Sequence, residues 1–183
     1  MPQRIVIIGN SATGKTTLAR ELAATFGCPH IERDAIQWGA GWQKASDTEF
    51  RARVTEAIQG DRWVADGNFS RVRDIVWGRA DTLIWLDYPL WFILGRLIRR
   101  SWKRVRDQED LWNGNHETWG HLLGRDGVFM WTLKAHFRHR SEYPVLLQEL
   151  QFKHLQVIRL RSMKATREWV EQLKKISMGD EKD

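Results

Sequence analysis

Residues 9–16 read GNSATGKT, which matches the pattern G-x-x-x-x-G-K-[ST] at every fixed position. The aliphatic run at residues 4–8, directly before this stretch, is typical of a central strand buried on both faces. A helical pattern begins at Lys15. Glycines let the backbone between such a strand and helix wrap with its N–H groups pointing inward, at the positive end of the helix. The sequence therefore predicts a polyphosphate-binding loop, or P-loop, at this point.

Two side chains at the end of the loop predict the ligand in more detail. Lys15 is expected to reach the β and γ phosphates, and the Thr16 hydroxyl is expected to coordinate Mg²⁺. We therefore predict that the ligand is a purine nucleoside triphosphate, ATP, bound together with Mg²⁺. The predicted nucleotide-binding residues are Gly9, Asn10, Ser11, Ala12, Thr13, Gly14, Lys15, Thr16 and Thr17.

Short β-type runs alternate with longer segments of helical period along the chain. Strands are expected at residues 4–8, 29–32, 62–65, 82–86 and 154–160. Helices are expected after the loop, after the capping box of Ser46 and Glu49, and at residues 90–106, 130–140 and 166–176. This alternation favours a three-layer α/β P-loop NTPase fold, with a five-stranded parallel sheet flanked by helices.

The organisation is expected to be a single domain over residues 1–183, because no linker or internal repeat interrupts the pattern. Within it, residues 96–140 are expected to form a basic helical lid, and residues 178–183 a polar tail.

Composition limits the classes of partner. A formal charge of +6 favours binding to polyanions, from nucleic acid to phosphorylated small molecules. The single Cys28 excludes an intramolecular disulfide and a cysteine-based metal cluster, in agreement with a cytoplasmic location. The apolar run at residues 4–8 is too short for a membrane span, so no membrane partner is expected. Most of the eleven tryptophans are expected in the core. The protein is expected to be a monomer or a homodimer.

A second anchor for Mg²⁺ is expected at the end of a neighbouring strand, where a carboxylate holds the ion through water. Asp66 and Asp87 each follow a predicted apolar strand and both satisfy this condition. The sequence leaves the choice between them open.

The layout resembles the P-loop kinases of small molecules, which include nucleoside monophosphate kinases such as adenylate kinase and the shikimate and gluconate kinases. Residues 66–71, DGNFSR, resemble the Asp-Gly-Phe-Pro-Arg segment of adenylate kinases. The resemblance implies that Asp66 serves Mg²⁺ through water and that Arg71 contacts phosphate. Because the proline is missing and the arginine comes one residue later, Arg73 is an alternative to Arg71.

The layout also resembles the adenylate kinase-related DNA topology modulation proteins of the FlaR type. Their pattern of an aspartate followed by two tryptophans is similar to Asp34, Trp38 and Trp42, and their Gly-Asn-aromatic-x-Arg segment is similar to residues 67–71, which include Asn68. The resemblance supplies no acceptor and establishes no activity on DNA.

The resemblance to shikimate and gluconate kinases implies an acceptor site around Asp34, which would orient the acceptor hydroxyl and accept its proton late in transfer. A turn role for Asp34 is the alternative. Trp38 and Trp42 would either form the floor of the acceptor pocket or anchor their own loop. The other residues assigned to the acceptor are Asn68 and Arg71.

The predicted helix at residues 90–106 resembles the start of a kinase lid, in which Arg96 and Arg100, one helical turn apart, would cover the base and the phosphates. His116 and Glu117 are expected on the exposed surface of this lid, without a role in the site.

Two functions compete at this point. The first is an ATP-dependent phosphotransferase that moves the γ-phosphoryl group to a small acceptor, as nucleoside monophosphate kinases do. The second is an ATP-binding regulator associated with nucleic acid, of the DNA topology modulation type, with weak ATPase activity. The absence of a recognised nucleic-acid-binding motif favours the first.

Overall fold

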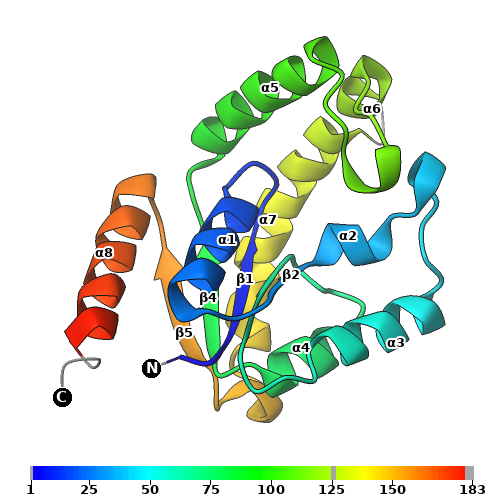
Figure 1. Cartoon of the computed structure of the whole chain (residues 1–183). Coiled ribbons are helices and arrows are strands. Elements are labelled where there is room, and N and C mark those ends of the chain that lie inside the picture. The colour runs from blue at the N-terminus through cyan, green and yellow to red at the C-terminus, as the bar shows by residue number, and fades with distance from the viewer. Residues whose placement is uncertain (1, 125–126, 180–183) are drawn as a thin grey trace.

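The computed structural model describes residues 2–124 and 127–179. Its centre is a five-stranded sheet in the order β2-β3-β1-β4-β5, in which every strand pair is parallel (Figure 1). The strands are β1 (Arg4–Gly9), β2 (His30–Glu32), β3 (Trp63–Asp66), β4 (Thr82–Leu86) and β5 (Gln156–Leu160). The predicted α/β architecture with five parallel strands is confirmed.

Helices follow most strands. The α-helices are α1 (Lys15–Phe26), α2 (Arg33–Gln37), α3 (Asp47–Ala57), α4 (Arg73–Arg79), α5 (Leu90–Arg106), α6 (Trp119–Leu123), α7 (Val128–Leu146) and α8 (Met163–Gly179). Three short 3₁₀ turns are η1 (Ala40–Trp42), η2 (Trp112–Gly114) and η3 (Leu150–Phe152). The predicted basic helix at residues 90–106 is confirmed as α5, and the predicted cap of α3 forms, since Ser46 Oγ accepts from Glu49 N at 3.2 Å.

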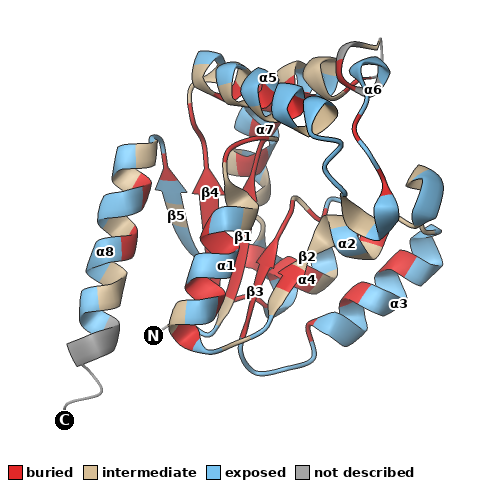
Figure 2. Cartoon of the chain, turned by 45° about the horizontal axis from the view of Figure 1, so that its top comes forward, coloured by how far each residue is buried: buried red, intermediate tan, exposed pale blue. Residues whose placement is uncertain are grey.

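Side chains alternate across the central strand and divide the core into two layers. Val6 and Ile8 on one face of β1 pack in a cluster with residues of α3, α4, α7 and η3. Ile5 and Ile7 on the other face pack with residues of α1, α5 and α8. Figure 2 shows buried residues concentrated in the strands and on the inward faces of the helices. The sheet is therefore the middle layer of three.

A third, smaller apolar cluster lies beyond the carboxyl ends of the strands. It joins Ala12 in the P-loop to Leu97 of α5 and Leu122 of α6. Figure 1 shows α5 and α6 together at this end of the molecule. The cluster fixes α5 directly above the P-loop. None of the helices in the described parts of the chain is long and apolar enough to cross a bilayer.

Three short helices were missing from the sequence prediction. Asp34 lies in the first turn of α2, α4 follows the segment around Asn68, and α6 forms where glycines were expected to interrupt the helical pattern. The final helix also extends further than predicted, because α8 includes residues 178 and 179 that were expected in the polar tail. The remainder of the predicted tail, residues 180–183, lies outside the described residues.

The expectation that most tryptophans lie in the core is wrong. The buried ones are Trp63, Trp77 and Trp85. Four others, Trp91, Trp102, Trp119 and Trp131, are exposed and lie on α5, α6 and α7. Aromatic residues therefore occupy the outer surface of the α5–α7 region as well as the core.

Candidate functional site

The P-loop connects the end of β1 to the start of α1. Gly9 leaves the strand at φ 151°, and a Cβ there would lie 2.8 Å from the carbonyl oxygen of Leu86 on β4. Gly14 precedes the helix in a left-handed conformation, at φ 94°. Only glycine accommodates the first approach, and glycine is strongly favoured at the second position. The loop is thus held close to the sheet, with the N-terminus of α1 behind it.

The remaining loop residues are tied to their surroundings. Asn10 is buried, and its side-chain amide donates to the Thr132 carbonyl of α7 at 2.7 Å. The Thr13 hydroxyl donates to the Asn10 carbonyl at 2.8 Å. Thr17 is exposed on the first turn of α1. These contacts stabilise the loop internally and fix it against α7.

Lys15 and Thr16 point to one locus beside Asp66. Lys15 Nζ donates to the Asn10 carbonyl at 2.8 Å, and Thr16 Oγ1 donates to Asp66 Oδ2 at 2.5 Å. The other oxygen of Asp66 lies 3.0 Å from His30 Nε2, which orients the carboxylate. Desolvation by burial lowers the pKa of Lys15 to about 8, against the attraction of Asp66 and Asp34.

A hydroxyl and a carboxylate are hard oxygen ligands of the type that Mg²⁺ prefers, and Mg²⁺ usually keeps several waters beside one or two protein ligands. No group of three or more His, Cys, Asp or Glu side chains forms a metal cage within the described residues. The donor set of Thr16 and Asp66 fits a phosphate-bound Mg²⁺ better than it fits a transition metal.

Asp87, the second candidate for the metal, is held in a structural ion pair. Its Oδ1 accepts from Arg140 Nε at 2.7 Å, and its Oδ2 accepts from Arg159 Nη2 at 2.5 Å. The carboxylate is buried and joins α7 and β5 to the end of β4. Both oxygens are thus occupied by arginine, whereas Asp66 is paired with Thr16 and His30.

Arg96 and Arg100, which the resemblance to kinase lids assigned to the base and the phosphates, both contact the loop from α5. Arg96 Nε donates to the Ala12 carbonyl at 2.9 Å, and Arg100 Nη2 donates to Ser11 Oγ at 3.2 Å. Burial and the neighbouring Arg104 lower the pKa of Arg100 to about 10, so it stays charged at pH 7. Of the other cationic residues on this helix, Arg99, Lys103 and Arg106 are exposed.

Asp34 lies in the first turn of α2, a different element from the α5 helix that carries Arg96 and Arg100. Its Oδ1 accepts from Arg33 Nη1 at 2.6 Å, and its side chain is 40% exposed. The Asp34 carboxylate raises the pKa of both Lys15 and Arg100, against the larger effect of their burial. Asp34 is therefore near enough to both cations to act on them electrostatically.

The two alternative arginines after β3 have different environments. Arg71 is paired with Asp47, donates to Gln37 Oε1 at 3.1 Å and lies over the Phe50 ring at 4.5 Å. Arg73 lies over the Trp77 ring at 4.9 Å and has no acidic partner within the described part of the chain. Arg71 is thus neutralised, whereas Arg73 forms no ion pair among the described residues.

Two side chains and a cavity near Arg73 were not assigned to the site from the sequence. His139 stacks on Tyr143 with ring centroids 4.6 Å apart, and the Tyr143 hydroxyl is buried without a hydrogen-bond partner. Burial, with the charges of Arg138 and Lys15, lowers the pKa of His139 to about 3, so the ring is neutral at pH 7. A cavity of about 550 Å³ opens beside Arg73 and Glu142. Nothing in the sequence brings α4 and α7 together, so this donor-rich region could not be predicted.

Trp38 and Trp42 lie half-buried in the loop after α2, edge to face at 5.7 Å. Their loop hydrogen-bonds to residues 111–117, since Trp42 Nε1 donates to the His116 carbonyl at 3.3 Å. Asn68 Oδ1 accepts from Gly9 N at 3.0 Å. This bond gives Asn68 a structural role in holding the P-loop.

Glu117 was expected on an exposed surface, and that expectation is wrong. Its carboxylate is buried, accepts a hydrogen bond from Ser101 and lies 3.5 Å from Arg104. His116 is half-exposed, as expected, with Nε2 3.3 Å from Asp110. Glu117 thus anchors its segment to α5, because burial of a carboxylate requires such partners.

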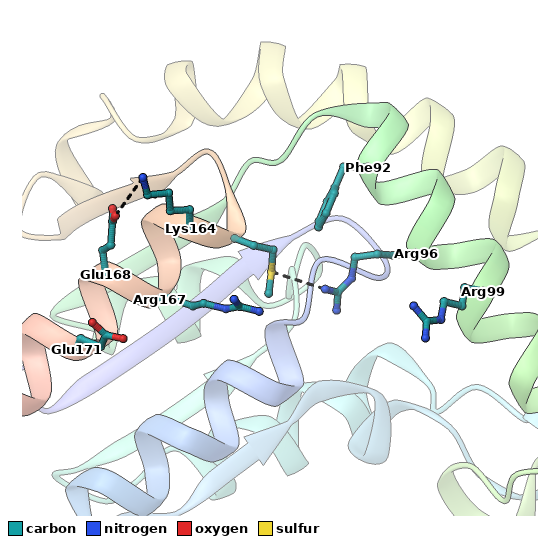
Figure 3. A pocket seen from close by; sticks show the side chains of 8 residues that line it. Phe92, Arg96, Arg99, Lys164, Arg167, Glu168 and Glu171 are labelled. Carbon is teal, nitrogen blue, oxygen red and sulfur yellow. Dashed lines mark hydrogen bonds and ion pairs between the residues drawn. The ribbon is translucent and has the colours of Figure 1, made fainter.

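A cavity of about 460 Å³ lies between α5 and α8, next to the P-loop (Figure 3). Phe92, Arg96 and Arg99 line it from α5, and Met163 and Arg167 line it from α8. Arg96 is shared with the P-loop and also lies 3.6 Å from the Met163 sulfur. The volume is within the range of small-molecule sites. The cavity could not be predicted from the sequence, because its two walls lie about seventy residues apart in the chain.

Comparison with known proteins finds similar solved structures but no similar curated sequence. No protein-family model and no curated protein matches the chain, so the resemblance to FlaR-type DNA topology modulation proteins is not supported. A shikimate kinase from Bacteroides thetaiotaomicron is similar with a TM-score of 0.55 at 15% identity, over 96% of this chain and 98% of that chain.

Two further solved structures are similar. A gluconokinase from Sinorhizobium meliloti 1021 gives a TM-score of 0.54 at 17% identity, over 97% of this chain and 95% of that chain. A shikimate kinase from Acinetobacter baumannii, solved in complex with shikimate, gives 0.55 at 18% identity, over 97% and 94%. The chain therefore has the P-loop kinase fold that these three structures share.

Proposed function

We propose that this protein is an ATP-dependent phosphotransferase that moves the γ-phosphoryl group of ATP to a small-molecule acceptor. The observation that carries the proposal is the convergence of Lys15, Thr16 and Asp66 at the P-loop, with Arg96 and Arg100 of α5 contacting the same loop. Phosphoryl transfer depends mainly on positioning and on neutralising charge. This set of residues supplies both.

The phosphate chain would occupy the loop, where backbone N–H groups and the α1 N-terminus stabilise negative charge. Lys15 would release the Asn10 carbonyl and pair with the β and γ phosphates. Thr16 and Asp66 would hold Mg²⁺, Asp66 through water, with His30 fixing the carboxylate. Mg²⁺, when bound, neutralises charge that develops on the phosphate oxygens. Asp87 has no part in this proposal, because its oxygens are bound by arginines.

The base of the nucleotide would occupy the cavity between α5 and α8. Arg96 and Phe92 on one side and Met163 on the other offer flat or polarizable surfaces to a purine ring. Arg96 would then contact the base and also hold the P-loop at Ala12. This arrangement would put the base on the α5–α8 side and leave the Asp34 side for the acceptor.

For the acceptor we propose a molecule with a reactive hydroxyl and an anionic group. Asp34 would orient the hydroxyl and take its proton as the phosphoryl group transfers. Arg73, with no acidic partner among the described residues, would bind the anion. One of the similar structures is a shikimate kinase in complex with shikimate, which supports a small-molecule acceptor in general.

A second candidate function rests on the outer face of α5. Trp91 and Trp102 are exposed there beside the cationic Arg99, Lys103 and Arg106, and the Arg106 guanidinium lies over the Trp102 ring at 4.7 Å. Exposed aromatic and basic side chains are typical of surfaces that bind nucleic acid. An ATP-binding regulator associated with nucleic acid, with weak ATPase activity, would use this face.

The experiment is to measure ADP formation from Mg-ATP by the purified protein. Nucleoside monophosphates, nucleosides, sugar acids, other hydroxy acids and short DNA are added one at a time. Release of ADP that depends on a small anionic acceptor supports the phosphotransferase. Stimulation by DNA alone would support the second candidate instead, and that effect is expected to weaken steeply with salt.

A further inference from the structure

Two segments that are far apart in the sequence are joined by hydrogen bonds beside Asp34. Residues 38–43 lie in the loop after α2 and are here called the α2 loop. Residues 111–117 lie in the connection between α5 and α6 and are here called the α5 connection. Asn113 Nδ2 donates to the Trp38 carbonyl at 2.5 Å, and Trp42 Nε1 donates to the His116 carbonyl at 3.3 Å. The two segments lie side by side (Figure 1).

Asn115 is the central residue of this junction. Its Oδ1 accepts from Trp42 N at 2.8 Å, and its Nδ2 donates to the Gly39 carbonyl at 2.9 Å and to the Trp112 carbonyl at 2.6 Å. The side chain is buried, with 3% of its surface exposed. Since each of these groups needs a partner in a buried place, removal of the amide leaves several of them unsatisfied.

The α5 connection is anchored at its other end to α5. The buried Glu117 accepts a hydrogen bond from Ser101 and lies 3.5 Å from Arg104. The same helix contacts the P-loop through Arg96 and Arg100. A continuous series of contacts thus leads from the P-loop through α5 and Glu117 to Asn115, and from there to the α2 loop.

A further contact brings this series next to Asp34. Trp112 Nε1 donates at 2.9 Å to Glu32 Oε1, at the end of β2, two residues before Asp34. The α5 connection is therefore attached on both sides of α2, which begins at Arg33 and ends at Gln37. A displacement of α5 toward the P-loop would move the α2 loop with it.

We propose that Asn115 is a positioning residue that couples nucleotide binding at α5 to the α2 loop, so that binding of Mg-ATP orders the acceptor side of the site. The inference rests on the proposed function. Asn115 touches neither ligand and acts through Gly39 and Trp42. By linkage, an acceptor that orders the α2 loop tightens ATP binding by the same factor, typically about 5- to 150-fold.

The test is hydrogen exchange followed by mass spectrometry on the full-length protein, with and without a non-hydrolysable Mg-ATP analogue. The variants are Asn115→Ala and the matched control His116→Ala, which removes a half-exposed side chain from the same segment and keeps the carbonyl that Trp42 contacts. Asn115→Asp is included because it keeps the oxygen that accepts from Trp42 N but loses both amide donations.

In the wild type and in His116→Ala, the analogue is expected to slow exchange at residues 9–16, in α5 and in residues 38–43. In Asn115→Ala and Asn115→Asp, protection is expected at residues 9–16 and in α5 but lost at residues 38–43. A residue with only a structural role would change the baseline exchange of this loop without abolishing its response to the nucleotide. If Asn115→Ala fails to fold, Asn115→Asp decides the result.

One outcome would refute the coupling alone, and another would refute the nucleotide site as well. If residues 9–16 are protected and residues 38–43 respond equally in the wild type and the Asn115 variants, or respond in neither, the coupling is refuted and the proposed function stands. If the analogue protects residues 9–16 in no protein, the nucleotide site itself is refuted, and the coupling with it.

Discussion

The charge of Lys15 is expected to oppose folding while it serves the phosphate site. Burial lowers its pKa from 10.5 to about 8, which means that the folded state disfavours the charged form. Such a shift corresponds to about 3 kcal/mol, and solvent contact at the part-exposed side chain reduces it to about 2 kcal/mol. We therefore predict that Lys15→Met raises the free energy of unfolding by about 2 kcal/mol at pH 7 and abolishes turnover.

The stability difference between Lys15→Met and the wild type is expected to depend on pH. At pH 7 both the folded and the unfolded chain hold the Lys15 proton, so the full penalty applies. Between the folded pKa of about 8 and the ordinary value of 10.5, the unfolded chain holds a proton that the folded chain has lost. The stability of the wild type therefore rises with pH relative to the variant. The advantage of Lys15→Met should shrink through this window and be lost above it.

The assay is urea unfolding of both proteins at a series of pH values from 7 to about 10.5, together with ADP formation at pH 7. Lys153→Met is the control, because Lys153 is exposed and the substitution should change stability little at any pH. A Lys15→Met protein that is less stable than the wild type at pH 7, or whose advantage stays constant across the window, would contradict burial as the cause. Turnover in the folded variant would contradict the role of Lys15.

The remaining predictions concern the two aspartates and the two arginines. Asp66→Asn should lower kcat/KM at least about 100-fold and raise the Mg²⁺ concentration needed for half-maximal activity, as kinetics at varied Mg²⁺ would show. Asp87→Asn should instead cost about 2 kcal/mol of stability in urea unfolding, with an unchanged Mg²⁺ requirement. Arg73→Ala should raise KM for the acceptor about 10- to 100-fold with little effect on KM for ATP. Arg71→Ala, which removes a neutralised arginine, should leave acceptor KM within about threefold of the wild type.

Much of the fold follows from local sequence signals. The buried strand at residues 4–8, the glycines around the P-loop and the capping box at Ser46 each act within a few residues, so their structures could be predicted. The helices α2, α4 and α6 could not be predicted in this way. Each spans seven residues or fewer, too short for a clear helical period, and each is stabilised by packing of residues such as Gln37 and Trp77 against distant elements.

The site is predictable where one segment supplies it and unpredictable where several segments meet. Lys15 and Thr16 follow from one motif. The choice between Asp66 and Asp87 depends on the distant Arg140 and Arg159, which occupy one carboxylate and leave the other beside Thr16. No local pattern carries that information, since ion pairs between separate elements arise only when the chain folds.

The same limit explains the misplaced Glu117. In a polar segment with many glycines and asparagines, a glutamate is more often exposed than buried. Its burial results from Ser101 and Arg104 on α5, which the sequence places on a basic helix without indicating which of its faces meets residue 117.

The most direct test of the central claim is to follow the radiolabelled γ-phosphate of ATP in the presence of Mg²⁺, the wild-type protein and each member of the acceptor panel. With the wild type the label is expected to appear in a small anionic acceptor, and with Lys15→Met this product is expected to be absent. Label recovered only as inorganic phosphate, at a rate that no small acceptor changes, would contradict phosphoryl transfer as the function of this site.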